Sequence, residues 1–248
     1  MPAAPGTQPA GVAPDSAAAH VRTMFDRIAP TYDRANHLLS LSVDRYWRWR
    51  AVRALRQRLA DFAPPVRVLD VCCGTGDLSL ALAAGLGPMT ELAGADFSHA
   101  MLARARAKAK APIVWIQADA LDLPWPDASF AAIASAFGFR NLADYRAGLA
   151  EFHRLLAPGG TLAILEISQP TLPVLAQIYP LYFHKLLPWL GGRISGHPAA
   201  YRYLPESVSR FPAPPELAAW MRAAGFSQVR LHRLSAGLAS LHLATRPA

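Results

Sequence analysis

Several features that define other protein classes are scarce in this chain of 248 residues. It contains only two cysteines, Cys72 and Cys73, and they are adjacent. Adjacent cysteines are poorly placed for a disulfide or a metal site, so we expect buried, reduced thiols in a cytoplasmic protein. No apolar run approaches the roughly 18 residues of a membrane-spanning helix. No metal-ligand cluster and no nucleophilic triad stands out, so we predict no metal site.

Acidic residues are outnumbered, with 17 against 25 basic residues and a formal net charge of +8. Six arginines lie between Arg45 and Arg58, interleaved with aromatic residues. Such a pattern can mark binding to nucleic acid or to an anionic membrane. We favour a solvated helix over 44–60 and predict no nucleic-acid partner. The residues expected to form its buried stripe are Trp49, Val52, Leu55 and Leu59.

The amino-terminal segment 1–19 is rich in alanine, proline and glycine and lacks the basic and apolar regions of a signal peptide. Its composition predicts a disordered tail. The remaining residues, 20–248, are predicted to form one domain, because 52% of the chain is hydrophobic and can supply a sizeable core. A short helix is expected over 18–28, and the first 60 residues read as a helical cap over the ligand side of a sheet.

The chain is organised around the segment that follows the cap. An apolar run over 66–71 predicts a buried parallel strand, and it contains the acid Asp70 near its end. Gly74 and Gly76 then allow a sharp turn and a close approach of a ligand to the backbone. An amphipathic helix is expected to begin near Asp77. This arrangement places a nucleotide-like ligand at the carboxyl end of the first strand.

The glycine loop departs from a dinucleotide fingerprint. That fingerprint has a third glycine three residues after the second, and Ser79 occupies this position here. An acid, Asp77, directly follows the second glycine, and its negative charge suits a cationic ligand such as S-adenosylmethionine better than a pyrophosphate. The loop alone is equally compatible with a plain tight turn.

Acids follow two further predicted strands. Asp96 lies 20 residues beyond Gly76, where an α/β fold places a carboxylate on a ribose diol, although a solvent-facing turn acid is the alternative. Asp119 lies just past the next strand, where it can accept from an adenine amino group. The strands expected after the glycine loop cover 91–95, 113–117, 130–136 and 161–167, followed by terminal strands at 228–234 and 238–244. Strands that alternate with helices in this way predict a doubly wound α/β sheet.

Together these residues resemble class I S-adenosylmethionine-dependent methyltransferases, and more narrowly the ubiquinone/menaquinone biosynthesis C-methyltransferase family. The segments that carry the narrower resemblance are 25–36, 138–141, 165–168, 201–207, 211–212, 224–226 and 234–242. The resemblance spans roughly residues 20 to 245. It implies a Rossmann-like seven-stranded sheet flanked by helices, with an antiparallel last strand, an amino-terminal helical cap and an insertion after the fifth strand.

The resemblance also implies a cofactor, S-adenosylmethionine, and the residues that hold it. Thr75 and Gly76 would line its methionine end, Asp70 would lie near the ammonium, and Asp96 would take the ribose. The full set of positions is Asp70, Gly74, Thr75, Gly76, Asp96, Asp119, Ala120 and Ala136. Ala136 departs from the family, which has a serine there; the nearest hydroxyl is that of Ser135. A second departure, at 195–200, replaces a usual Asp-rich stretch and leaves room for a different ring preference.

The implied reaction is C-methylation of a prenylated quinol precursor, either demethylmenaquinol or 2-polyprenyl-6-methoxy-benzoquinol. The ring carbon becomes nucleophilic when a neighbouring hydroxyl loses its proton, which calls for a base or for a cation beside the phenolate. Arg140 is the predicted cation, and Asn141 would orient the ring. Tyr201 and Tyr203 would hold the quinol oxygens. Asp33 or His197 could act as the base, and each is as readily a structural turn residue.

The predicted insertion, 168–211, is rich in leucine and aromatic residues with basic residues nearby. It is expected to be a lid packed on the core, an apolar surface that receives an isoprenoid tail at the inner face of the membrane, or both. Self-association or assembly with other quinone-biosynthesis enzymes is also expected. Two other functions stay open: a methyltransferase for another small aromatic or lipid acceptor, and a non-catalytic binding module.

Overall fold

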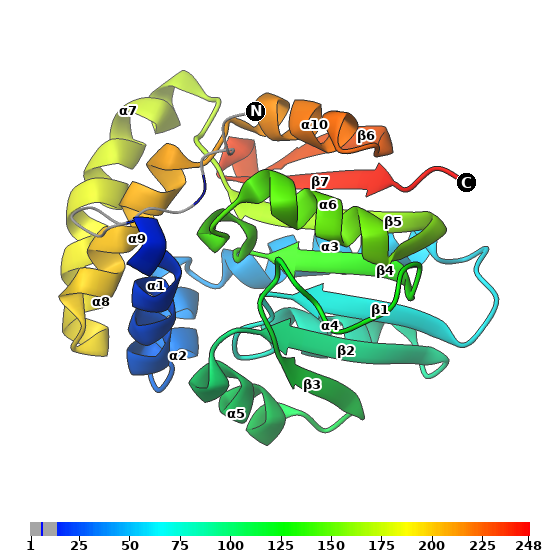
Figure 1. The fold of residues 1–248 in the computed structure, drawn as a ribbon. Helices are drawn as coiled ribbons and strands as arrows, with labels where there is room; N and C mark the ends of the chain where they lie inside the picture. Colours follow the sequence, from blue (N-terminus) through cyan, green and yellow to red (C-terminus); the bar gives the residue numbers. More distant parts are fainter. Residues whose placement is uncertain (1–5, 7–13) are drawn as a thin grey trace.

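The computed structural model describes residue 6 and residues 14–248, in which a central sheet has helices on both faces (Figure 1). The strands are β1 (Val66–Val71), β2 (Thr90–Asp96), β3 (Ile113–Gln117), β4 (Phe130–Ala136), β5 (Leu156–Ile167), β6 (Ser227–Leu234) and β7 (Ala239–Thr245). They form one seven-stranded sheet in the order β3-β2-β1-β4-β5-β7-β6. β1 to β5 are parallel to their neighbours in this group, whereas β7 runs antiparallel to β5 and β6. The predicted α/β sheet with an antiparallel last strand is confirmed.

The strand order reverses at β1, and this reversal sets the place of the ligand site. Val68 of β1 lies opposite Leu92 of β2 on one side and Ala132 of β4 on the other. The loops that leave β1 and β4 diverge there, and open parallel sheets bind ligands in such a crevice. β5 begins at Leu156, earlier than the predicted 161, because Leu156 pairs with Phe130 before a shift of register.

Successive side chains of β1 point to opposite faces of the sheet and enter different cores. Val68 packs with residues of α3 and α4, whereas Leu69 packs with residues of α6 and α10. A further helix, α5, lies against β2 and β3. The helices named here are α3 (Val43–Arg58), α4 (Asp77–Leu86), α5 (His99–Lys108), α6 (Tyr145–Leu155) and α10 (Pro214–Ala223). Both faces of the sheet are therefore covered, which fits the continuous apolar runs of its parallel strands.

The buried stripe of α3 differs from the prediction at one position. Trp47 is 8% exposed and packs on the core, whereas Trp49, expected in the stripe, is 50% exposed. Residues two apart on a helix point in nearly opposite directions, so only one of these indoles can face the sheet. Trp49 stacks instead on Tyr46 at the surface, and the Arg53 guanidinium lies over its ring.

The amino-terminal helix α1 (Pro14–Ile28) begins earlier than predicted. Residues 14–19 were assigned to a disordered tail, but they are helical, and Ala17 is buried together with Val21 one turn later. Proline is favoured in the first turn of a helix because its missing N–H would have no partner there. The rest of the predicted tail, 1–5 and 7–13, lies outside the described residues.

A second layer of helices covers the carboxyl ends of the strands. It combines the amino-terminal helices with the segment between β5 and α10, and the two groups lie together at the left of Figure 1. Besides α1, its elements are α2 (Tyr32–Leu39), α7 (Pro173–Leu181), the π-helical turn η2 (Tyr182–Leu186), α8 (Leu187–Ser195) and α9 (Pro198–Arg210). Leu39 of α2 and Phe183 of η2 share its apolar core, and the Tyr182 hydroxyl donates to the Leu39 carbonyl. None of the described helices is both long and apolar enough to cross a membrane.

Candidate active site

A cavity of about 450 Å³ lies between the helical layer and the loops after β1, β2 and β4. This volume falls within the range of about 300–1,000 Å³ that is typical of small-molecule sites. Most of the predicted site residues lie on its wall: Asp70, Gly74, Thr75, Asp96, Asp119, Ala120, Ala136, Arg140, Asn141, Tyr201 and Tyr203. Two predicted residues, Gly76 and Asp33, do not lie on the wall, and their contacts explain why.

The two glycines of the loop have different roles. Both have positive φ, +54° at Gly74 and +84° at Gly76, which side chains rarely adopt. A Cβ at Gly74 would meet nothing within 4 Å, and this residue faces the cavity. A Cβ at Gly76 would lie 2.8 Å from the Trp115 ring and 3.0 Å from Ala105. Gly76 therefore allows the loop to pack against α5 and β3, and its contact with the cofactor stays a prediction.

Asp70 has one carboxylate oxygen with a partner and one without. Oδ2 accepts from the Ser79 hydroxyl at 2.5 Å, whereas Oδ1 is buried and has no hydrogen-bond partner among the described residues. Burial raises the pKa of Asp70 to about 7, against the opposing effects of the Ser79 hydrogen bond and the charge of Arg48. An unpaired buried carboxylate oxygen is costly, so this atom is suited to a cationic donor from a ligand.

Asp96, at the end of β2, is held by backbone donors. Its oxygens accept from the Gly74 N–H at 2.8 Å and from the Ser98 N–H at 2.9 Å. Burial raises the pKa of Asp96 to about 6, against the effect of these hydrogen bonds. A carboxylate can accept about four hydrogen bonds, so both oxygens retain capacity for a diol. Asp119 is exposed at the rim, where it accepts from the Leu121 N–H at 3.0 Å.

Arg140 is buried and held from several directions. It lies in a short 3₁₀ turn, η1 (Phe139–Asn141), directly after β4, and is 5% exposed. Its Nη1 donates to Glu166 Oε2 at 3.0 Å and to the Phe137 carbonyl, and its backbone N–H donates to Glu166 Oε1 at 3.0 Å. Its Nε donates to the Ser207 hydroxyl at 3.4 Å. Burial opposes the charge, but the Glu166 carboxylate raises the pKa of Arg140, so the guanidinium stays charged.

Hydroxyl and amide groups surround Arg140 on the cavity wall. The Tyr203 hydroxyl donates to Asn141 Oδ1 at 2.9 Å, which fixes the orientation of that amide. The Tyr201 hydroxyl is buried and has no hydrogen-bond partner among the described residues. Tyr32 also lines the cavity, although the sequence analysis did not select it. Burial raises the pKa of Tyr32 and the charge of Arg140 opposes this, so the phenol lies within electrostatic reach of the guanidinium.

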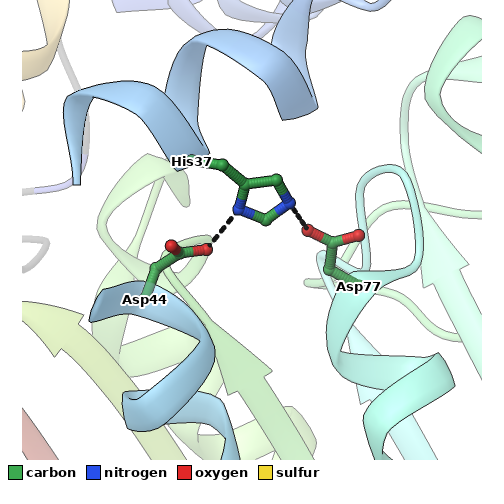
Figure 2. A group of neighbouring side chains, drawn as sticks. All are labelled: His37, Asp44 and Asp77. Carbon is green, nitrogen blue, oxygen red and sulfur yellow. Dashed lines mark hydrogen bonds and ion pairs between the residues drawn. The ribbon is translucent and has the colours of Figure 1, made fainter. Parts of the chain in front are cut away.

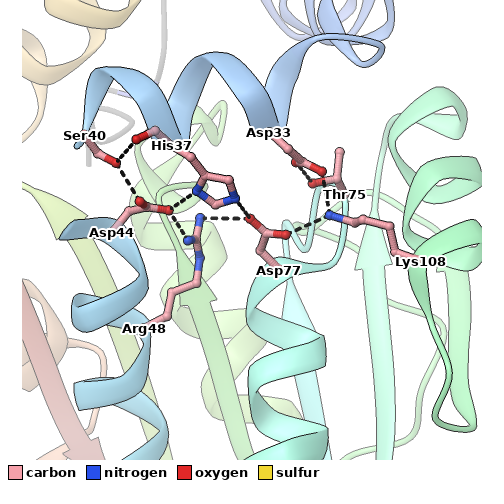
Figure 3. Close-up of polar contacts among 8 residues, drawn as sticks. All are labelled: Asp33, His37, Ser40, Asp44, Arg48, Thr75, Asp77 and Lys108. Atoms are coloured by element: carbon pink, nitrogen blue, oxygen red, sulfur yellow. Dashed lines mark hydrogen bonds and ion pairs between the residues drawn. The ribbon is translucent and has the colours of Figure 1, made fainter. Parts of the chain in front are cut away.

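The two residues proposed as the base lie away from the cavity. Asp33 accepts from the Thr75 hydroxyl, and its other oxygen lies 2.7 Å from Lys108 Nζ (Figure 3). His197 is half-buried at the start of α9, where its backbone N–H donates to Ser195 Oγ at 3.0 Å. Neither residue lines the cavity, and both make structural contacts, so a base function stays a prediction for each.

A histidine and two acids meet where α2 and α3 face the glycine loop, as Figure 2 shows. His37 Nδ1 lies 2.9 Å from Asp44, and its Nε2 lies 3.3 Å from Asp77. Three groups at this spacing could bind a metal ion, but both acids already form ion pairs with basic side chains. Arg48 pairs with Asp44, and Lys108 lies 2.7 Å from Asp77. A divalent ion would meet both positive charges, so the group links the helical layer to α4 instead.

The sequence model of the ubiE/COQ5 methyltransferase family matches residues 14–246. The chain belongs to this family. The demethylmenaquinone methyltransferase of Thermus thermophilus is 50% identical over 227 residues, which are 90% of this chain and 100% of that protein. The enzyme of the same name from Deinococcus radiodurans is 49% identical, covering 89% and 90%. The ubiquinone/menaquinone biosynthesis C-methyltransferase UbiE of Syntrophotalea carbinolica is 44% identical, covering 91% and 93%.

Solved structures with the same fold are more distant in sequence. An S-adenosylmethionine-dependent methyltransferase from Thermotoga maritima aligns with a TM-score of 0.61 at 20% identity, over 92% of this chain and 100% of that chain. The CurJ carbon methyltransferase aligns with a TM-score of 0.62 at 15% identity, over 95% and 68%. These likenesses show the fold alone. Membership of the ubiE/COQ5 family makes this protein an S-adenosylmethionine-dependent methyltransferase.

The residues of this methyltransferase fit S-adenosylmethionine. Asp70 has an unpaired buried oxygen that would suit the ammonium, and Asp96 has a backbone-held carboxylate that would suit the ribose. A Cβ at Gly74 would meet nothing within 4 Å, so this residue would leave room for the ligand. Ala136 lies on the wall but supplies no hydroxyl. Ser135 does not replace it, because successive residues of β4 point to opposite faces and Ser135 does not line the cavity.

Proposed function

We propose that this methyltransferase transfers a methyl group to a ring carbon of a prenylated quinol, with a demethylmenaquinol-type naphthoquinol as the preferred acceptor. The relatives at 50% and 49% identity carry the name of that activity, which supports the naphthoquinol over the benzoquinol. The observation that carries the proposal is Arg140. It is a buried, charge-paired cation on the cavity wall that also contains the cofactor acids Asp70 and Asp96.

The cofactor, when bound, supplies a methyl group already activated on a sulfonium. The protein therefore has to align the acceptor and favour its ionised form. Arg140 stabilises the phenolate directly or through a water, because a fixed cation in a site closed to bulk water interacts strongly with developing negative charge. Asn141, held by the Tyr203 hydroxyl, orients the ring. The unpaired Tyr201 hydroxyl donates to a quinol oxygen.

We also propose that residues 168–211 contact the membrane surface when the acceptor enters. Phe183 and Leu187 of this segment are buried in the apolar core that it shares with α1 and α2, as a lid requires. The other side of the segment is apolar and open, with Val174 69%, Ile178 58% and Leu181 61% exposed. An amphipathic surface of this kind can enter the boundary between lipid headgroups and acyl chains, where a prenyl tail resides. Association with other proteins stays a prediction.

A labelled-methyl assay tests the acceptor. Enzyme and labelled S-adenosylmethionine are incubated with demethylmenaquinol or with the demethylated ubiquinol precursor in detergent, and the methylated position is located by mass spectrometry. The proposal predicts label on a ring carbon, with the higher kcat/KM for the naphthoquinol. If calorimetry shows cofactor binding while neither quinol takes label, the quinol assignment is wrong and only the methyltransferase assignment stands.

A further inference from the structure

The cofactor acids leave one part of S-adenosylmethionine without a partner. Its amino-acid end carries an ammonium and a carboxylate, and the predicted site residues include no cation for the carboxylate. Among the described residues, the cations on the cavity wall are Arg48 and Arg140. Arg140 is paired with Glu166 and belongs to the proposed acceptor site. Arg48 comes from α3, a helix in which no site residue was predicted.

Arg48 is the one arginine of α3, among its described residues, that lines the cavity. Arg45, Arg53 and Arg56 are exposed and Arg50 and Arg58 are half-buried elsewhere, whereas the Arg48 side chain is 12% exposed. Its guanidinium lies 5.3 Å from the centre of the Phe137 ring in the loop after β4. Burial raises the pKa of Asp70, near the end of β1, and the Arg48 charge opposes that rise. Arg48 therefore lies at the part of the cavity wall where the glycine loop begins.

The surroundings of Arg48 hold it while leaving donors available. Nη1 donates to Asp44, which is itself held by the Ser40 hydroxyl at 2.5 Å and by His37 at 2.9 Å (Figure 3). Nη2 lies 3.7 Å from Asp77, beyond hydrogen-bond distance. A guanidinium has five N–H donors in a planar fork, which suits it to a carboxylate.

The acid nearest the remaining donors is also paired with another cation. Lys108 Nζ lies 2.7 Å from Asp77, and 2.7 Å from Asp33 on the far side of the same group. An incoming carboxylate is therefore opposed less by Asp77 than that acid alone would imply. A carboxylate removed from water without a cationic partner would be strongly disfavoured. We propose that Arg48 binds the α-carboxylate of S-adenosylmethionine, opposite the ammonium subsite at Asp70.

Calorimetry with two ligands tests this assignment without any acceptor. Decarboxylated S-adenosylmethionine keeps the sulfonium and the ammonium but lacks the carboxylate. The loss of a charge-assisted hydrogen-bonded pair predicts that it binds the wild-type enzyme about 10- to 100-fold more weakly than S-adenosylmethionine. Arg48→Gln should weaken the binding of S-adenosylmethionine by about the same factor. Its affinity for the decarboxylated ligand should stay within about twofold of the wild-type value. Arg45→Gln, on the same helix and exposed, should change neither.

Each contrary outcome is decisive. Equal affinity of the wild-type enzyme for the two ligands would show that no carboxylate subsite exists, and this measurement needs no variant. If Arg48→Gln loses the same amount of affinity for both ligands, Arg48 acts through the fold and not on the carboxylate. The assignment rests on the cofactor and not on the acceptor. A failure of the quinol proposal therefore leaves these affinities unchanged, and a failure here leaves the labelled product unchanged.

Discussion

The pair formed by Glu166 and Arg140 makes a strong prediction, because both side chains are buried. Glu166 is 0% and Arg140 is 5% exposed, and the carboxylate accepts from both the backbone and the guanidinium of Arg140. In Glu166→Gln the shape is kept, but the charge is lost and an amide N–H₂ must face one of these donors. Removing one partner of a buried pair costs about 3–5 kcal/mol, because the other charge stays buried. We expect the free energy of unfolding to fall by about 3 kcal/mol.

The same substitution should lower kcat, since Arg140 loses the partner that fixes it beside the acceptor. Cofactor affinity should stay unchanged, because Glu166 does not line the cavity. Urea unfolding, calorimetry with S-adenosylmethionine and turnover of the quinol measure the three effects. The control is Asp127→Asn, which breaks a pair with Arg154 at 2.8 Å, and Asp127 does not line the cavity. The Asp127 side chain is 73% exposed, so about 1 kcal/mol or less is expected there, with full activity. Wild-type stability and turnover in Glu166→Gln would refute the reasoning.

Three further predictions follow from single sites. Cofactor binding should release protons between about pH 6 and pH 7. In the free enzyme, burial raises the pKa of Asp96 to about 6 and that of Asp70 to about 7, so both carboxyls are partly protonated in this range. The ammonium and the ribose hydroxyls of the bound cofactor would favour the ionised carboxylates. Calorimetry in buffers of different ionisation enthalpy measures the release, and Asp70→Asn should reduce it; uptake of protons would contradict the assignment. Gly76→Ala should cost about 1–3 kcal/mol of stability through its positive φ and its contact with Trp115, and an unchanged unfolding midpoint would contradict the packing argument. Ile178→Glu should reduce co-sedimentation with anionic vesicles while Met89→Glu, equally exposed elsewhere, should not; equal binding of both variants would exclude this face as the contact.

The sequence was sufficient for the sheet and for the acids at its edge. The apolar runs predicted the ends of β1 to β4 to within one residue. The position of Asp96 at the end of β2 followed from its spacing to the glycine loop. These features are local, because a run of buried residues and a turn are encoded by neighbours in the chain. The start of α5 is encoded in the same local way, because the Ser98 hydroxyl accepts from the Met101 N–H as an N-cap does.

The contacts between distant segments could not be predicted. The residues next to Asp33 in the sequence do not indicate that its carboxylate contacts Thr75 and Lys108. Arg48 is one arginine among several on its helix, and only the fold shows that its face meets Phe137 and the glycine loop. A helical wheel that placed Asp44, Arg48 and Leu55 on one face would have been the available clue, since all three lie on the inner side of α3.

In the proposed function, Arg140 stabilises the ionised quinol during methyl transfer. The most direct measurement is the rate of methyl transfer from labelled cofactor to demethylmenaquinol by Arg140→Gln combined with Glu166→Gln, a double variant that removes both charges and leaves neither buried alone. Loss of a cation beside a developing oxyanion predicts a fall of about 10²–10³ in kcat, with the Kd for S-adenosylmethionine unchanged. Methyl transfer at the wild-type rate by the folded double variant would contradict the account.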